Sequence, residues 1–289
     1  MHALTPETYA DLARLVEELC GVVLGPDKAY LVRHRLEPLL KQENIATFVE
    51  LVSRARSLGQ ATLRDQIIDA ITTRETSFFR DDGPFDAVRS VWLVNIFKQL
   101  ELSKTKRARI WSAACSHGQE PYSLAMILRE FCDTYFEKNP TTLNPIDRFS
   151  ILATDVSPEA LRLARQAKFS TSELARGLSP KLIERHFDFD SAGRYTLRPD
   201  VRKIVEFVRH NLLLSNNPGL NLGFFDLILC RNVLIYFEDR VKQRVIKTLA
   251  DALQPGGILI IGAAESLHNV PHTLRPIRLG NSVAYQRPE

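Results

Sequence analysis

The stretch RIWSAACSHGQEPYSLAMILREF, residues 109–131, indicates the fold class of this chain. It begins with an apolar run of strand length, Arg109–Ala114, passes through a loop of small residues, and ends in a helix predicted over Glu120–Phe131. The same order returns along the chain, with strands predicted at 149–154, 205–208, 225–230 and 257–262 and helices at 158–167 and 238–253. Such alternation predicts an α/β fold, with an open parallel sheet covered by helices on both faces.

Two further segments complete this predicted sheet domain, which we place at residues 106–289. The tail Ile277–Arg287 has the pattern of two strands that turn at Gly280-Asn281, and it predicts a closing antiparallel strand. Between about 170 and 204 the strand–helix alternation pauses around Ser191–Gly193. This pause predicts a small antiparallel β insert within the sheet domain.

The first 75 residues have a different character. Thr5-Pro6-Glu7 predicts a capped helix start, and apolar residues follow at helical spacing up to Leu19. Further helices are predicted near 28–43, 47–58 and 63–71. Because this stretch shows no strand pattern, we predict an N-terminal all-α domain over residues 1–75, joined to the sheet domain by a linker over 76–105.

The composition is that of an ordinary globular protein. Of 289 residues, 45% are hydrophobic and 25% charged, and the formal net charge is +4. A charge this small does not predict a nucleic-acid binder. The four cysteines are widely spaced, which is typical of free thiols in a reducing compartment. Neither a signal peptide nor an apolar run of about 18–20 residues is present, so we expect a cytoplasmic protein without membrane insertion.

Candidate ligand-binding residues follow the predicted strands, because parallel sheets bind ligands at the carboxyl ends of their strands. The loop Ala113–Pro121 opens a helix, but its single glycine, Gly118, does not make a dinucleotide fingerprint. Asp155 ends the second strand, where a carboxylate accepts hydrogen bonds from a ribose diol. Each feature also fits an ordinary strand–helix turn, and the pattern alone leaves both interpretations open.

Two later segments narrow the class of enzyme that the sequence predicts. The turn Leu253–Ile261, with its Pro-Gly-Gly, resembles the turn before the fifth strand of Rossmann-like methyltransferases. Cys230–Phe237 follows the fourth strand and lacks the Asn/Asp-Pro-Pro-Tyr and Pro-Cys signatures of two groups of base methyltransferases. His268 and His272 flank a proline, which spoils the helical geometry of a zinc pair, so no metal is expected.

Four blocks carry a more specific resemblance. They are similar, in order, to the signature blocks of the chemotaxis receptor methyltransferases, the CheR family, and the likeness runs from about residue 5 to 287: TTRETSFFR at 72–80, WSAACSHGQEPYS at 111–123, ATDV at 153–156 and CRNVLIYF at 230–237. This resemblance implies a Rossmann-like S-adenosylmethionine methyltransferase sheet that follows an all-α domain. It also implies transfer of a methyl group to glutamate side chains of chemotaxis receptors, which leaves S-adenosylhomocysteine and serves sensory adaptation.

The resemblance also implies roles for individual residues. Thr76 and Arg80, in the segment before the sheet domain, would contact the methionine end of the cofactor, and Glu120 would hold its amino group. Asp155 would bind the ribose. The remaining implied contacts are to the adenine and the reacting methyl group: Asn211 and Leu212 near the adenine, Arg231 and Asn232 lining the pocket, and Tyr236, with Arg231, at the catalytic centre.

The helical domain is expected to dock on the acidic helical bundle of the receptor's cytoplasmic region, through Arg33, Arg35 and Lys41. A solvated face of an ordinary helix is the alternative for these three side chains. The insert around Asp188–Tyr195 is shorter than in tethered relatives, which favours an enzyme independent of a receptor C-terminal peptide. A monomer is expected. Two other functions stay open: methylation of a small molecule or RNA, and a non-catalytic cofactor-binding module.

Overall fold

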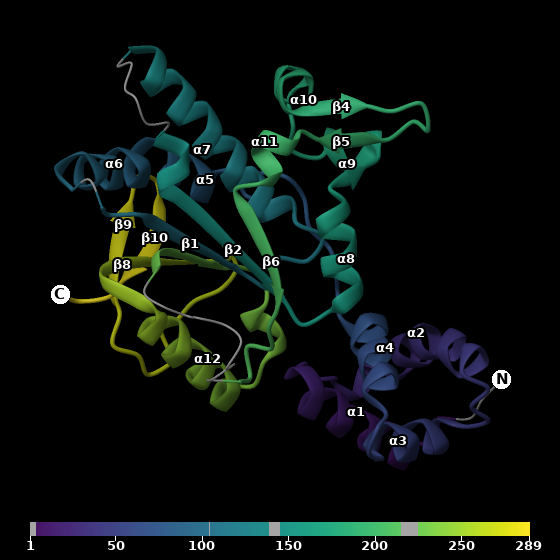
Figure 1. The fold of residues 1–289 in the computed structure, drawn as a ribbon. Coiled ribbons are helices and arrows are strands. Elements are labelled where there is room, and N and C mark those ends of the chain that lie inside the picture. Colours follow the sequence, from purple (N-terminus) through teal and green to yellow (C-terminus); the bar gives the residue numbers. More distant parts are fainter. Residues whose placement is uncertain (1–3, 104, 139–144, 215–224) are drawn as a thin grey trace.

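A seven-stranded mixed sheet forms the centre of the molecule in the computed structural model, which describes residues 4–103, 105–138, 145–214 and 225–289 (Figure 1). Its strand order is β6-β2-β1-β7-β8-β10-β9. The strands are β1 (Ala108–Ala113), β2 (Phe149–Asp155), β6 (Val205–Arg209), β7 (Phe225–Cys230), β8 (Leu253–Ile261), β9 (Arg275–Leu279) and β10 (Ser282–Gln286). The chain therefore reverses its direction of strand addition next to β1, which is the switch point where such sheets bind ligands.

The pairing pattern confirms the predicted fold class. β1 pairs in parallel with both β2 and β7, and β8 continues the parallel order. β10 lies antiparallel to both β8 and β9, and Gly280 adopts a left-handed φ of 58° at the β9–β10 turn, as the tail sequence predicts. Every residue of β7 is buried, as expected for a strand covered on both faces.

Helices cover the two faces of this sheet. On one face lies α7 (Gln119–Lys138), together with the short η3 turn (Pro145–Arg148). On the other lies α12 (Asp239–Ala252), whose apolar residues Val245 and Leu249 pack against Leu259 of β8. In Figure 1, α12 lies below the sheet and α7 above it. None of the helices in the described ranges is both long and apolar enough to cross a membrane.

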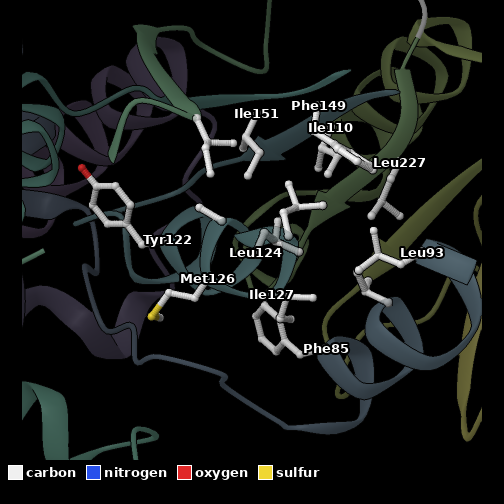
Figure 2. Packing of buried hydrophobic residues seen from close by; sticks show 14 of the residues in the cluster. Phe85, Leu93, Ile110, Tyr122, Leu124, Met126, Ile127, Phe149, Ile151 and Leu227 are labelled. Carbon is white, nitrogen blue, oxygen red and sulfur yellow. The ribbon is translucent and has the colours of Figure 1, made fainter. Parts of the chain in front are cut away.

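The segment predicted as a linker, residues 76–105, is instead largely helical. It contains α5 (Gly83–Ala87), a π-helical turn η2 (Val88–Trp92) and α6 (Leu93–Leu102). Figure 2 shows Phe85 and Leu93 packed among Ile127 of α7 and Leu227 of β7. The segment forms helices because its apolar residues recur at helical spacing. It belongs to the core on one face of the sheet because these residues pack against α7 and β7.

Four helices before this segment form a body of their own: α1 (Pro6–Cys20), α2 (Ala29–Gln42), α3 (Phe48–Arg56) and α4 (Ala61–Ile71), with a 3-10 turn η1 at Pro26–Lys28. Thr5 caps α1 by accepting a hydrogen bond from the Thr8 backbone N–H at 3.2 Å. Leu12, Leu36 and Ile67 are fully buried in a separate apolar core. The all-α character predicted for this stretch is thus observed in its described residues.

Polar contacts fix the helical body against the sheet body. The Asp69 carboxylate of α4 accepts from the Ser157 hydroxyl, at the start of α8 (Pro158–Gln166), at 2.5 Å. Arg209, at the end of β6, forms an ion pair with Asp65 of α4. These contacts join the two bodies along one edge of the sheet, where Figure 1 shows α4 beside the first turn of α8.

The predicted β insert is a three-stranded antiparallel sheet of order β3-β5-β4. It consists of β3 (Lys168–Phe169), β4 (Phe187–Phe189) and β5 (Tyr195–Leu197), with α9 (Thr171–Ala175), α10 (Pro180–His186) and α11 (Pro199–Arg202) around them. β4 is an outer strand, and its Phe189 is 64% exposed. The insert therefore presents an unpaired strand edge with an apolar side chain upon it.

Candidate cofactor and methyl-transfer site

A cavity of about 1270 Å³, its open mouth included, lies between the helical body and the carboxyl ends of the parallel strands. Its walls come from both bodies: the end of α1 and the start of α2, the segment Ile71–Arg80, and the residues that follow β1, β2, β6 and β7. Every cofactor-site and catalytic residue predicted from the sequence lines this cavity: Thr76, Arg80, Glu120, Asp155, Asn211, Leu212, Arg231, Asn232 and Tyr236.

Asp155 is a nearly buried carboxylate at the end of β2, with only 9% of its surface exposed. One oxygen accepts from the Ser116 N–H at 2.8 Å, and the other accepts from the Ser157 N–H at 2.9 Å. Burial raises the pKa of the Asp155 carboxyl, while these backbone hydrogen bonds work in the opposite direction. The two oxygens retain unused lone pairs, so the carboxylate can still accept hydrogen bonds from a ligand diol.

The loop after β1 approaches Asp155 in a strained conformation. Ala114 and Ser116 have left-handed φ values of 60° and 51°, a region that ordinary residues occupy at some cost. Gly118 has a φ of 91°, and a Cβ there would lie 3.1 Å from Ala164. The loop therefore holds its backbone at the cavity wall, immediately before α7 begins.

Arg231 is the buried centre of an ionic network that reaches the surface at Asp81. Its side chain is 2% exposed and forms ion pairs with Asp81 at 2.9 Å and Glu120 at 3.1 Å. It also donates to the Arg80 carbonyl oxygen at 2.6 Å, and its guanidinium lies over the Phe85 ring. Arg231 thus ties the segment before the sheet domain to the end of β7 through its two terminal nitrogens, while its buried Nε has no hydrogen-bond partner among the described residues.

Glu120 and Arg80 lie at this same end of the cavity. One Glu120 oxygen accepts from the Ser112 hydroxyl at 2.8 Å, while the other pairs with Arg231. The Arg80 guanidinium donates to the Glu75 carbonyl oxygen at 3.1 Å and forms no ion pair with any residue that the structure describes. This end therefore offers a carboxylate to a bound amine and a guanidinium to a bound carboxylate.

Another part of the cavity wall follows β6. Asn211 follows β6, and its amide donates to the Leu19 carbonyl oxygen of α1 at 2.8 Å, while its neighbour Leu212 is buried. His210, which the sequence pattern does not single out, is 2% exposed, and neither of its ring nitrogens has a hydrogen-bond partner among the described residues. Burial lowers the pKa of His210, so its imidazole is neutral near pH 7.

Tyr236 belongs to the loop after β7, which ends in a 3-10 turn, η4 (Leu234–Tyr236). Its ring lies at the cavity wall, half-buried, and its carbonyl oxygen accepts from the Val23 N–H at 2.9 Å. The second residue of this loop, Asn232, has a left-handed φ of 57°. The segment that follows α1 therefore contacts the loop that carries Tyr236.

The predicted receptor-docking residues separate in the structure. α2 turns about 100° per residue, so Arg33 and Arg35 lie about 200° apart around its axis. Arg35 lines the cavity and donates to the Ile71 carbonyl oxygen at 2.5 Å. Arg33 is half-buried, whereas Lys41 is exposed near the end of the helix. The three side chains do not form one continuous basic stripe.

The remaining reactive groups are also accounted for. All four cysteines are free and buried, and burial raises the pKa of the Cys20 thiol to about 11 and that of Cys132 to about 12. Over the described residues, no three His, Cys, Asp or Glu side chains group as metal ligands.

The cavity as a whole offers opposite charges at one end, from Arg80 and Glu120, and the buried carboxylate of Asp155 elsewhere in its wall. This set of polar groups fits a zwitterionic nucleoside.

Two family models cover nearly the whole chain. The model of the CheR methyltransferase SAM binding domain matches residues 74–282, and the model of the CheR methyltransferase all-alpha domain matches residues 7–72.

Three curated relatives have comparable lengths. Chemotaxis protein methyltransferase 1 of Pseudomonas aeruginosa is 40% identical over 272 residues, which are 94% of each chain. Chemotaxis protein methyltransferase Cher2 of Pseudomonas putida is 37% identical with the same coverage. The chemotaxis protein methyltransferase of Vibrio parahaemolyticus is 37% identical over 284 residues, which are 98% of each chain.

Proposed function

The chain belongs to the CheR methyltransferase family, as a chemotaxis methyltransferase that uses S-adenosylmethionine, and on that premise we propose that it esterifies glutamate side chains of a chemotaxis receptor. The observation that carries this proposal is the cavity between the two bodies, which is lined by two carboxylates, the Arg80 guanidinium and Tyr236. We further propose that the enzyme acts in the cytoplasm as a monomer.

Within this proposal, each end of the cavity has one task. Arg80 pairs with the carboxylate of the methyl donor, Glu120 accepts from its amino group, and Thr76 lies beside them. Asp155 accepts from the ribose hydroxyls, while Asn211 and Leu212 border the adenine. Arg231 holds Glu120 and the Arg80 backbone in place, a positioning role rather than the catalytic one expected from the sequence.

The reaction requires little acid–base chemistry from the protein. When bound, S-adenosylmethionine supplies a methyl group activated by its sulfonium. A glutamate side chain, whose ordinary pKa is about 4.3, is already a carboxylate at neutral pH, so no general base is required. The chain's own residues therefore act by orienting the acceptor oxygen and excluding water, with Tyr236 and Asn232 at the place where the methyl moves.

Docking is proposed to use the exposed part of α2 and the cavity mouth. Lys28 and Lys41 are exposed at the two ends of α2, and Lys28 also lines the cavity, so the surface around α2 carries a positive charge beside the opening. An acidic receptor helix would be attracted to this surface. Arg35, which is held by the Ile71 carbonyl, is assigned to the cavity wall instead.

The proposal of tether independence rests on the insert. The turn between β4 and β5 is closed by a hydrogen bond from the Asp190 N–H to the Arg194 carbonyl oxygen at 2.8 Å, so the hairpin is short. We propose that the enzyme methylates receptors that lack a C-terminal peptide. Receptors with and without such a tail should then be methylated at equal rates.

The function is tested with radiolabelled S-adenosylmethionine and membranes that contain the cognate chemoreceptor. Alkali should release volatile methanol from the labelled receptor, because methyl esters are base-labile, and Asp155→Ala should abolish most of the release. Label that resists alkali would point to another acceptor atom. Cofactor binding without any transfer to receptor would favour a non-catalytic module, and transfer to RNA or a small molecule alone would overturn the receptor assignment.

A further inference from the structure

Glu265 lies three residues beyond Gly262, the first residue after β8, and its half-buried carboxylate gathers backbone N–H groups from two loops. One oxygen accepts from the Asn232 N–H at 2.8 Å and from the Gly262 N–H at 2.7 Å. The other oxygen is 3.3 Å from the Ile235 N–H. Glu265 forms no ion pair with any described residue, so its known contacts are directed at these backbone donors.

Two of these donors belong to the loop that follows β7. Asn232 occupies the left-handed region with a φ of 57°, which asparagine adopts more readily than most residues with a side chain and which turns the chain sharply. Hydrogen bonds from backbone N–H groups to a carboxylate are among the stronger ones in proteins. The carboxylate of Glu265 therefore fixes the turn that Asn232 makes in this loop.

The approach of the two loops leaves no room for a side chain at Gly262. A Cβ there would lie 2.7 Å from the nearer Glu265 oxygen and 2.8 Å from the Asn232 nitrogen. Such distances lie below those of ordinary carbon contacts, so the end of β8 and the loop after β7 meet only because residue 262 is glycine. Gly262 and Glu265 together therefore fix the position of the loop after β7.

That loop contains three of the predicted site residues. Arg231, at its start, is held by Asp81 and Glu120, and Tyr236, at its end, is held through its carbonyl by the Val23 N–H. Between these two anchors, the described contacts that fix the loop backbone to another segment of the sheet body come from Glu265.

We propose that Glu265 is a positioning residue that sets the location of Asn232 and Tyr236 against the bound methyl donor. This inference rests on the proposed function of the cavity. It predicts that loss of the carboxylate lowers the rate of methyl transfer more than it weakens substrate binding, because a loop displaced by about 1 Å can cost roughly a hundredfold in rate.

The test compares Glu265→Gln and Glu265→Ala with Glu206→Gln, a control on β6 whose exposed carboxylate has no described hydrogen bond. With receptor membranes, kcat should fall about tenfold to a hundredfold in Glu265→Ala, while KM for the receptor changes less than about threefold. Glu265→Gln, which keeps one acceptor oxygen, should retain an intermediate kcat. A kcat unchanged in both variants would overturn the proposal.

A second measurement does not depend on the acceptor. Hydrogen exchange of the peptide that spans 231–237 should accelerate in Glu265→Ala but not in Glu206→Gln, because the Asn232 and Ile235 amides lose their acceptor. Unchanged exchange would overturn the role of Glu265. Faster exchange in a protein that labels no receptor would support that role while counting against the proposed function.

Discussion

At the scale of the residue, Asp155 must satisfy two opposed demands. It is buried, which raises the pKa of its carboxyl, yet the proposed ribose contact requires the charged form. Because the pKa is raised, protonation begins at a higher pH than for an exposed aspartate, and a protonated carboxyl loses acceptor capacity. We predict that affinity for S-adenosylhomocysteine falls on acidification above the ordinary aspartate range.

Titration calorimetry over an acid-to-neutral pH series measures this. Hydrogen bonds to a charged group contribute about 1.5–3 kcal/mol, so Asp155→Asn should weaken binding at neutral pH by at least about tenfold. It should also remove the acid-dependent loss that the wild type shows. A variant that keeps the wild-type pH profile would contradict the assignment of that titration to Asp155.

Arg231 gives a second prediction at this scale. Replacing it with methionine leaves Glu120 and Asp81 without their cation, and because Asp81 is exposed the loss should lie below the value of about 3–5 kcal/mol for a broken, fully buried ion pair. The double variant Arg231→Met/Glu120→Gln should recover part of that loss, because one uncompensated charge is removed. Urea unfolding measures both, and equal stabilities for the single and double variants would contradict coupling between the two side chains.

The sequence alone predicts some of the site residues but not others. The rule that strand ends carry ligand contacts selects Asp155 and Arg231, and both line the cavity. The same rule, applied after β8, would have drawn attention to Glu265. The burial of His210 and the partners of Arg231 could not be predicted, because they depend on contacts between segments far apart in the chain.

At the scale of the element, the insert supports the cofactor cavity through Gly177. This glycine has a φ of 110°, and a Cβ there would lie 1.9 Å from the Phe78 carbonyl oxygen. Phe78 stands between Thr76 and Arg80, so Gly177→Ala should displace both. We predict a loss of about 2–5 kcal/mol in unfolding free energy, from overpacking and backbone strain together.

The matched control is Gly193→Ala in the same insert. Gly193 has a φ of 75°, and a Cβ at this position would meet no atom within 4 Å, so only the backbone cost of about 1–2 kcal/mol remains. Affinity for S-adenosylhomocysteine should fall in Gly177→Ala and stay unchanged in Gly193→Ala. Equal affinities in the two variants would show that the insert does not support the cavity.

Elements were predictable where the apolar period was clear. The alternation of strands and helices after residue 105 predicts five strands of the large sheet, and the tail pattern predicts the other two. β8 begins at Leu253, four residues before its predicted start, because the Pro-Gly-Gly segment expected to be a turn is part of the strand. The helices in 83–102 were missed, because their apolar positions were taken for a linker before the sheet began. Their role follows only from the tertiary packing of Phe85 and Leu93 against α7 (Figure 2).

At the scale of the whole molecule, the cavity joins two bodies that each have their own apolar core. A ligand that contacts both stabilises both, by about 2.7 kcal/mol at a concentration of roughly 100 times its Kd. Hydrogen exchange with S-adenosylhomocysteine should therefore slow in α1 as well as in the segment after β2. Protection confined to the sheet body would contradict a cavity shared with the helical body.

The central claim is that the acceptor is a glutamate carboxylate of the receptor, and locating the transferred methyl group tests it most directly. Tandem mass spectrometry of receptor peptides, after incubation with the enzyme and S-adenosylmethionine, should find the added methyl on glutamate side chains, with the modification removed by alkali. A methyl group on a nitrogen or sulfur atom, or no modified receptor peptide beside active enzyme, would contradict the account.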